Sequence, residues 1–354
     1  MTSMFLSPQD RVFQIEVTTQ CNLKCAGCFR TVSVANGKWE SRHIDVEVFR
    51  TAIEQTRPAQ AIILQGIGEP TLHPHLPELI KIAHDSGKFQ TISFYTNGLA
   101  RSIDYYDTLK ANGLNMLTVS VDSLTQPVAD QCRFGTDVGK LLQRMVELYY
   151  TFAPNIQFSL VLSRKNADDA FNTFRILNEI AKTGQEPLVV MVQRMIMMSK
   201  DLAADYEMRP EDLAVFQDKI RLHEGAFPHL RLGLCGVLQP ACAAQSSCVQ
   251  TSTAQETKGP PLCDKPYYDR YVTLDGELAP CCVLIDGAEW GHTRLDAPLA
   301  ELLARPAITE WFARYATQGH KGCKACSLMS ALPADVAQRV RASCATGSPE
   351  PEAA

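Results

Sequence analysis

The chain has 354 residues, of which 45% are hydrophobic and 21% charged, and its formal net charge is −5. This composition excludes disordered and fibrous proteins, and the mildly acidic balance gives no general attraction to nucleic acid or anionic lipid. The sequence lacks an apolar run of about 18 residues, and its first residues lack a secretion signal. We expect a cytoplasmic protein that binds neither nucleic acid nor membrane.

The sequence contains 13 cysteines, which is many for a protein of a reducing compartment, where disulfides are rare. Metal or redox chemistry is the natural use of so many thiols. At roughly 150 residues per domain, the length predicts one large domain with a smaller one beside it.

Residues 11 to 195 alternate short apolar runs with segments of helical period, as repeated βα units do. Strands are predicted at Val12 to Thr18, Ala61 to Gln65, Thr91 to Tyr95, Met116 to Val121, Gln157 to Leu162 and Leu188 to Gln193. Helices are predicted over 45–57, 76–86, 103–111, 138–151 and 168–182. Six units are too few for a closed eight-stranded barrel, so we predict an α/β fold with a partial (β/α)6 TIM-like barrel. Its site should lie in the loops after the strands.

The second half of the chain does not continue the regular alternation of strands and helices. A helix is predicted from Pro210 to His223, and a linker or insertion follows from Leu234 to Pro261. Asp275-Gly276, between two short apolar runs, predicts a hairpin. We predict a core over 1–198, a helical linker and insertion over 199–262, a small Cys-rich domain over 263–330, and a C-terminal helix with a disordered tail over 331–354.

Three cysteines follow the first predicted strand in the spacing C-x3-C-x2-C: Cys21, Cys25 and Cys28, called here the first cysteine set. Closely spaced thiolates on one loop can bind three irons of a [4Fe-4S] cube and leave the fourth iron open. An open position is what a catalytic metal site needs. A zinc knuckle or chance clustering is the alternative.

This motif resembles the radical S-adenosylmethionine (SAM) superfamily. The resemblance implies that the open iron binds SAM, and that an electron from the cluster cleaves SAM to a 5'-deoxyadenosyl radical, which takes a hydrogen atom from a substrate. An external donor such as a flavodoxin or ferredoxin would supply that electron. The family commonly has an aromatic residue before the third cysteine, where this chain has Gly27.

Further segments are similar to the superfamily's SAM-binding positions. The resemblance implies SAM contacts for Gly66, Gly68, Glu69, Pro70, Thr96, Asn97, Ser120 and Asp122. Ser120 and Asp122 share one side of a strand and suit hydrogen bonds to a ribose. Arg133 and Arg164 could pair with the SAM carboxylate, but we interpret both as surface arginines.

Four more cysteines form the second cysteine set: Cys263, Cys281, Cys323 and Cys326. Four thiolates can bind one tetrahedral zinc or all irons of a [4Fe-4S] cube, and spacing alone does not choose between them. The order resembles the short C-terminal twitch domain, a relative of the SPASM domain, which implies one auxiliary [4Fe-4S] cluster. Cys281 and its neighbour Cys282 point to opposite faces of a strand, and we favour Cys281 as the ligand.

The remaining cysteines are assigned little chemistry. Cys235, Cys242 and Cys248 lie in the predicted insertion, where a thiol near the radical could donate a hydrogen atom, although an inert thiol is the simpler interpretation. Cys132 and Cys344 are interpreted as structural or incidental.

The resemblance implies a radical SAM enzyme, of oxidoreductase type. We expect a two-electron oxidation of a polar, carbohydrate-like small molecule or of a peptidyl residue, with the auxiliary cluster as electron acceptor. One alternative is an epimerase or crosslinking maturase of a ribosomal peptide, although the short segment before the first strand leaves no room for an N-terminal peptide-recognition domain. Another is a non-catalytic zinc or iron-sulfur scaffold.

Overall fold

The computed structural model describes residues 10–195, 197, 200–235, 260, 262–323, 326 and 331–346. Its main feature is a curved nine-stranded sheet in the order β11-β10-β1-β3-β4-β5-β7-β8-β9. The strands are β1 (Asp10–Ile15), β3 (Ala59–Leu64), β4 (Phe89–Thr96), β5 (Met116–Ser120), β7 (Ile156–Leu162), β8 (Leu188–Arg194), β9 (Leu230–Cys235), β10 (Asp269–Val272) and β11 (Leu278–Ala279). Neighbouring strands are parallel, except that β11 runs antiparallel to β10.

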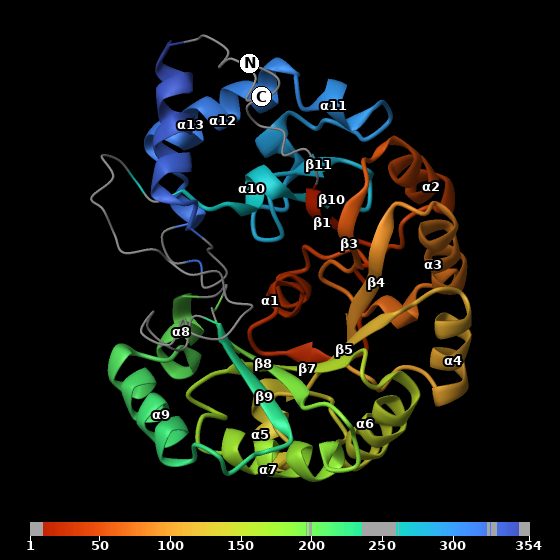
Figure 1. Cartoon of the computed structure of the whole chain (residues 1–354), viewed down its shortest axis with the longest axis vertical. Coiled ribbons are helices and arrows are strands. Elements are labelled where there is room, and N and C mark those ends of the chain that lie inside the picture. The colour runs from red at the N-terminus through yellow and green to blue at the C-terminus, as the bar shows by residue number, and fades with distance from the viewer. Residues whose placement is uncertain are drawn as a thin grey trace.

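Helices cover the outer side of this sheet, and α1 lies near the middle of the view (Figure 1). The core helices are α1 (Phe29–Ala35), α2 (Val46–Gln55), α3 (Leu76–Asp85), α4 (Ile103–Ala111), α5 (Gln126–Cys132), α6 (Val138–Phe152), α7 (Ala170–Ala181), α8 (Lys200–Tyr206) and α9 (Pro210–Leu222). The C-terminal helices are α10 (Lys265–Tyr268), α11 (Leu299–Leu302), α12 (Pro306–Gln318) and α13 (Ala334–Thr346). Two short strands, β2 (Lys24–Cys25) and β6 (Arg133–Phe134), pair separately.

The sheet and its helices are built by the patterns that predicted them. Strand residues such as Phe13, Ile62 and Phe94 are fully buried, as expected of parallel strands beneath helices. Helix α2 begins where the Asp45 side chain accepts hydrogen bonds from the N–H groups of Glu47 and Val48. The six predicted strands and five predicted helices are confirmed to within a few residues, and so is the partial-barrel class.

The sheet is larger than the sequence predicted. Leu230–Cys235, expected to lie within a linker and insertion, forms β9 and extends the parallel sheet beyond β8. The predicted hairpin is present as β10 and β11, but β10 also pairs in parallel with β1. The strand β9 and the joining of the hairpin to the sheet were not predicted, because pairing between segments far apart in the chain leaves no local signal.

A buried ion network joins β10 to β1. Arg270, whose side chain is 0% exposed, forms an ion pair with Asp10 at 2.9 Å. Asp10 also forms an ion pair with Arg57 at 2.9 Å. Beside them, Arg11 pairs with Asp264 at 2.7 Å. This network fixes the C-terminal segment against the first strand of the core.

We expect Asp10→Asn to lower the free energy of unfolding by about 3 kcal/mol, because Arg270 would keep a buried charge without its carboxylate partner. Urea unfolding followed by circular dichroism measures the change. Asp85→Asn is the control, since Asp85 pairs with Lys81 on the exposed face of α3 and its loss should change stability far less. Equal losses in the two variants would contradict a stabilising role for the buried network.

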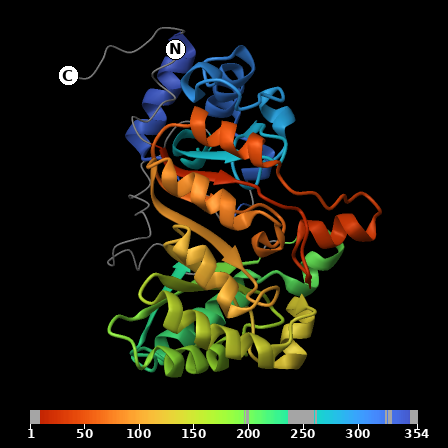
Figure 2. The same ribbon diagram turned by 90° about the vertical axis from the view of Figure 1, so that its right-hand side faces the viewer.

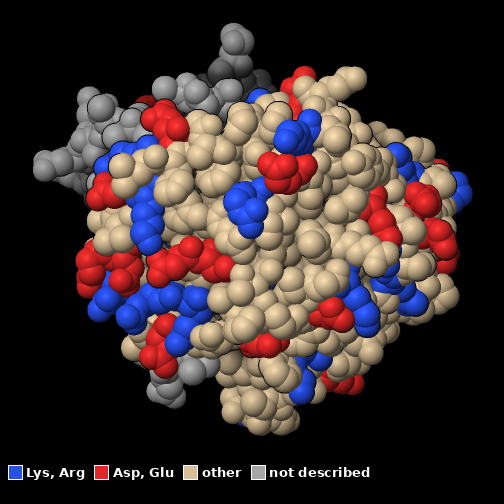
Figure 3. Space-filling view, turned by 90° about the horizontal axis from the view of Figure 1, so that it is seen from below, with Lys and Arg blue, Asp and Glu red and all other residues tan. Residues whose placement is uncertain are grey.

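No helix within the described residues is long and apolar enough to cross a membrane. The face seen in Figure 3 carries basic and acidic side chains side by side.

Candidate active site

The first cysteine set lies on the loop between β1 and α1. Cys25 is in β2 and lies opposite Arg133 of β6 in the strand pairing, while Cys28 directly precedes α1 as its N-cap. The loop is held by its own backbone: the Cys28 N–H donates to the Cys25 carbonyl at 3.2 Å, and the Leu23 N–H donates to Cys21 Sγ at 3.5 Å. All three cysteines are partly exposed and none is in a disulfide. Figure 2 shows α1, in red, projecting from one edge of the molecule.

Gly27 departs from the family pattern for a visible reason. A Cβ atom at this position would lie 3.2 Å from Sδ of Met195, which follows β8 and is 5% exposed. An aromatic side chain would have no room there unless Met195 moved. Phe29, one residue past the third cysteine, is 43% exposed and its ring packs edge-on against Trp39.

Arg133 is the main charged group beside the first cysteine set. Its side chain is only 15% exposed and lies 3.5 Å from the Asp122 carboxylate, so the expectation of a surface arginine was wrong. Burial opposes its charge, but Cys25 and Asp122 outweigh burial and raise the pKa of the guanidinium. Arg164 is a surface arginine as expected, 35% exposed and paired with Asp212.

Burial disfavours the charged form of either group, so it lowers the pKa of an arginine but raises the pKa of a cysteine thiol. It raises the pKa of the Cys25 thiol to about 11, with Arg133 opposing the shift. A thiolate here is costly unless a cation compensates it, as bound iron would.

The predicted SAM-binding turn packs directly against this loop. A Cβ atom on Gly68 would lie 2.3 Å from the Thr18 carbonyl oxygen, and one on Gly66 would lie 2.2 Å from the Glu16 side chain. The Gly68 N–H donates to that Thr18 carbonyl at 3.1 Å. The glycines are therefore required by close packing on the segment that leads into the first cysteine set. This contact was not foreseen from the sequence, which explained them by the approach of a ligand.

Glu69 joins the turn to the end of β4. The carboxylate is 3% exposed and accepts hydrogen bonds from the Thr71 hydroxyl at 2.7 Å, the Thr96 hydroxyl at 2.8 Å and the Asn97 N–H at 2.8 Å. The Asn97 side chain in turn donates to Asn22, inside the cysteine loop, at 2.8 Å. The structure thus brings the predicted residues of β3 and β4 together with the first cysteine set.

The predicted residues at the end of β5 contact Arg133 and the neighbouring strand β7. Asp122 is 3% exposed, and its carboxylate accepts a hydrogen bond from the Val161 N–H at 2.9 Å besides facing Arg133. Ser120 ends β5 and is half-buried. Asp122 therefore holds β7 and Arg133 in place.

Glu16 is a site residue that the sequence analysis missed. It follows β1, is 7% exposed, and accepts a hydrogen bond from the Ile67 N–H at 2.9 Å. Burial raises the pKa of its carboxyl, against the hydrogen bond from Ile67. The signal that could have found it is an acidic residue within an otherwise apolar strand end.

The raised pKa of Glu16 predicts a pH dependence of stability. The folded chain holds this proton more tightly than the unfolded chain, so the stabilisation is complete below the ordinary value of 4.5 and is lost as the pH rises through the folded pKa. Glu16→Gln should therefore flatten the fall of unfolding free energy between pH 4.5 and neutrality. Urea unfolding at several pH values measures the slope, with the exposed Glu78→Gln as control. A slope equal to that of the wild type would contradict the assignment.

The second cysteine set lines one pocket. The walls of this small pocket contain Cys263, Cys281, Cys323 and Cys326 together with Lys265. Cys282 is not among the residues that line it. The Leu284 N–H donates to Cys281 Sγ at 3.5 Å, and burial raises the pKa of the Cys281 thiol to about 12. The structure brings together the four residues that the sequence grouped.

Within the part of the chain that the structure describes, no group of three or more His, Cys, Asp or Glu side chains is arranged to hold a metal ion. Four cysteines on one zinc, each about 2.3 Å from it, would lie within about 4 Å of one another. In a [4Fe-4S] cluster each cysteine binds a different iron, so the sulfur atoms lie farther apart.

The other predicted cysteines are scattered. Cys242 and Cys248 lie outside the described residues, and Cys235 is the last residue of β9. Cys132 is fully buried, and its Sγ lies 3.8 Å from the Ser163 hydroxyl, consistent with the structural role expected of it. Cys344 is in α13.

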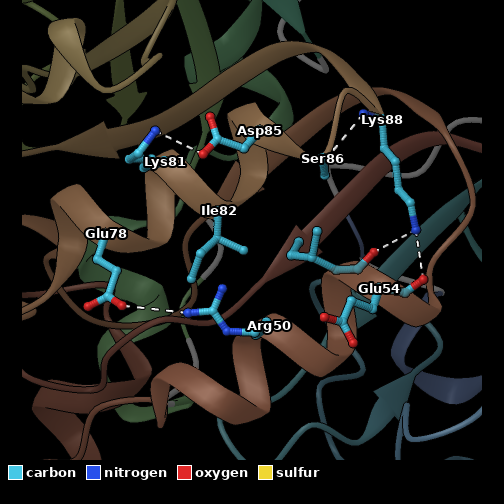
Figure 4. Close-up of a pocket in the computed structure, with 9 residues that line it drawn as sticks. Arg50, Glu54, Glu78, Lys81, Ile82, Asp85, Ser86 and Lys88 are labelled. Atoms are coloured by element: carbon cyan, nitrogen blue, oxygen red, sulfur yellow. Dashed lines mark hydrogen bonds and ion pairs between the residues drawn. The ribbon is translucent and has the colours of Figure 1, made fainter.

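A separate hollow of about 570 Å³ lies between α2 and α3, on the outer layer of helices (Figure 4). Arg50 pairs with Glu78 at 3.6 Å and Lys81 with Asp85 at 2.8 Å, while the Lys88 ammonium donates to backbone carbonyls at the end of α2. None of the cysteines lines it. We therefore do not regard it as the active site.

Comparisons with known proteins agree with the geometry of the cysteine loop. Residues 15–175 match the Radical SAM superfamily. Over 168 residues the chain is 28% identical to a PqqA peptide cyclase of Ruegeria pomeroyi, which covers 47% of this chain and 43% of the relative. Over 113 residues it is 33% identical to a 7,8-dihydro-6-hydroxymethylpterin dimethyltransferase of Methanocaldococcus jannaschii, covering 32% and 22% of the two chains. The chain thus spans less than half the length of either relative.

Solved structures share the fold over most of the chain. Native anSMEcpe with bound AdoMet covers 94% of this chain and 96% of its own, with a TM-score of 0.62 at 18% identity. Streptococcus suis SuiB bound to S-adenosylmethionine covers 92% and 72%, with a TM-score of 0.64 at 12% identity. At these identities the likeness concerns the fold alone. The fold and the match over residues 15–175 together show that this chain carries a radical SAM domain, the domain of a superfamily of enzymes.

Proposed function

We propose that this chain is a radical SAM oxidoreductase with two iron-sulfur clusters. The observation that carries the proposal is the pocket whose walls contain the whole second cysteine set, in a C-terminal segment that β10 joins to the strand leading into the first set. Membership of the superfamily implies SAM and one [4Fe-4S] cluster. The second cluster and the oxidation are the proposal.

The first cysteine set fits the SAM-binding cluster. Three thiols from one loop would bind three irons, and the buried Arg133 would hold the negatively charged SAM carboxylate beside them. The turn from Gly66 to Pro70, with Thr96, Asn97, Ser120 and Asp122, would shape the rest of the SAM site. When bound, the reduced cluster supplies the electron that cleaves SAM. An external donor of the flavodoxin or ferredoxin type would then reduce the cluster again.

The second cysteine set fits an auxiliary [4Fe-4S] cluster of the twitch type. Its four thiols would occupy all four irons, so this cluster would bind no substrate and would serve as an electron acceptor. Cys281 has the N–H···S hydrogen bond and lines the pocket, which favours it over Cys282 as the ligand. The proposed reaction is then removal of two hydrogen atoms from a polar, carbohydrate-like molecule or a peptidyl residue.

A second candidate is modification of a ribosomal peptide, by crosslinking or epimerisation. It is favoured by the match to a PqqA peptide cyclase and by the likeness in fold to SuiB, which has also been solved bound to its precursor peptide SuiA. In the epimerisation variant, Cys235, Cys242 or Cys248 would return the hydrogen atom.

Mass spectrometry of candidate substrates in heavy water separates epimerisation from oxidation and crosslinking. Oxidation or crosslinking removes two hydrogen atoms, while epimerisation replaces one hydrogen by deuterium. We expect the first result, and deuterium uptake without loss of hydrogen would contradict the proposed oxidation. The neighbouring genes offer the candidates to be tested.

Metal analysis after anaerobic reconstitution tests the non-catalytic alternative. Two [4Fe-4S] clusters require about eight irons per chain and one requires about four. Zinc without iron would contradict both the proposed clusters and the enzyme function built on them.

A further inference from the structure

The hydroxyl of Tyr315 lies between two cysteines of the second set. Tyr315 is on α12 and is 2% exposed; its oxygen accepts a hydrogen bond from the Cys263 N–H at 2.8 Å and lies 3.9 Å from Cys323 Sγ. Its ring stacks on Trp311, with centroids 4.8 Å apart and an angle of 16° between the planes. The aromatic packing of α12 therefore sets the position of this hydroxyl.

The direction of the hydrogen bond to sulfur follows from the first contact. A tyrosine hydroxyl has one proton to donate and lone pairs to accept with. The Cys263 N–H can only donate, so it occupies a lone pair of the oxygen. The hydroxyl proton remains, and within the described residues Cys323 Sγ is the other hydrogen-bond partner recorded for this oxygen. Either atom can donate while Cys323 is a thiol, but the sulfur of a metal-bound thiolate can only accept, so Tyr315 would then be the donor.

We propose that Tyr315 donates a hydrogen bond to the Cys323 thiolate of the auxiliary cluster and thereby raises the reduction potential of that cluster. The inference rests on the proposed function, because it needs a cluster on the second cysteine set. Hydrogen bonds to ligand sulfurs are one of the factors that set such potentials. The reduced cluster carries one more negative charge than the oxidised cluster, so a donor stabilises the reduced form more.

A raised reduction potential suits the proposed role of the auxiliary cluster as an electron acceptor. In the proposed oxidation, the substrate would lose one hydrogen atom to the deoxyadenosyl radical, then a proton to solvent and one electron to the oxidised auxiliary cluster held by the second cysteine set. The substrate is oxidised by two electrons, and the cluster is reduced by one. A higher potential makes that last transfer more favourable.

The formal charges beside the pocket largely compensate one another. Lys265 lines the pocket but lies 3.5 Å from Asp269, whose carboxylate also faces Arg11 at 3.3 Å. Arg11 pairs in addition with Asp264 at 2.7 Å. Two cations and two carboxylates compensate one another on this side. The Tyr315 dipole, by contrast, points at a ligand sulfur.

The test is the midpoint potential of the auxiliary cluster, measured by redox titration followed by electron paramagnetic resonance. The full chain carrying Cys21→Ala, Cys25→Ala and Cys28→Ala removes the first cluster, so that the signal belongs to the second. In this background, Tyr315→Phe should lower the potential by up to about 59 mV, equal to a tenfold fall in the ratio of reduced to oxidised cluster at fixed potential. Tyr149→Phe is the matched control. Tyr149 is 4% exposed and its hydroxyl donates to the Ala181 carbonyl, and both residues are distant in sequence from the second cysteine set. It should leave the potential unchanged.

A second variant keeps the test decisive where Tyr315→Phe fails to bind iron. Fluorotyrosine at position 315 retains the ring and makes the hydroxyl a stronger donor, so the potential should rise. About four irons per chain with an unchanged potential in either variant would overturn the role of Tyr315 and leave the auxiliary cluster standing. Absence of iron from the background chain itself would overturn the auxiliary cluster, and this inference with it.

Discussion

Replacing Cys21, Cys25 and Cys28 by alanine should abolish the formation of 5'-deoxyadenosine from SAM under reducing conditions. The three thiols lie on one loop, and no SAM-binding cluster can assemble without them. Chromatography of the nucleoside formed by the anaerobically reconstituted protein measures the loss. We expect a fall to the level of a sample without protein.

The matched control for that variant is Cys132→Ala. Cys132 ends α5 next to Arg133, and it is fully buried near Cys25, yet it lies outside the first cysteine set. This variant should keep its iron and its cleavage of SAM. Nucleoside formation that survives in the triple variant would show that the first cysteine set was assigned wrongly.

Cys281→Ala should separate cleavage of SAM from the completed reaction. The variant should lose about four of about eight irons, because one ligand of the auxiliary cluster is gone. It should still form 5'-deoxyadenosine but should no longer release the oxidised product, since the electron has no acceptor. Iron analysis and product analysis on the same sample measure the two effects.

Cys282→Ala is the control for this second prediction. Cys282 is the next residue along the chain but is absent from the pocket walls. Full iron content and product formation are expected. Loss of iron in Cys282→Ala with retention in Cys281→Ala would reverse the ligand assignment.

Local patterns predicted the core of the fold well. The strands near Ile62, Phe94 and Leu117 stand out as short apolar runs between helical segments, and the structure buries all three residues fully. Residues spaced along one loop, as Cys21, Cys25 and Cys28 are, could be grouped for the same reason: the signal is local. The four cysteines of the second set were grouped by their arrangement along the chain, and the family resemblance was needed to assign them a cluster.

Long-range pairing could not be predicted in this way. The place of β10 beside β1 depends on contacts such as Asp10 with Arg270, which lie 260 positions apart. The burial of Arg133 depends on the pairing of β2 with β6. Glu16 and Tyr315 act through hydrogen bonds to backbone or sulfur atoms of other segments, and a single sequence does not mark such partners.

The most direct test of the central claim is the electron paramagnetic resonance spectrum of the reduced, reconstituted chain before and after addition of SAM. If the first cysteine set leaves one iron open, SAM binds that iron and changes the spectrum of one cluster, while the signal of the second cluster stays as it was. A spectrum that SAM leaves unaltered, in a protein that contains its full iron, would contradict the account.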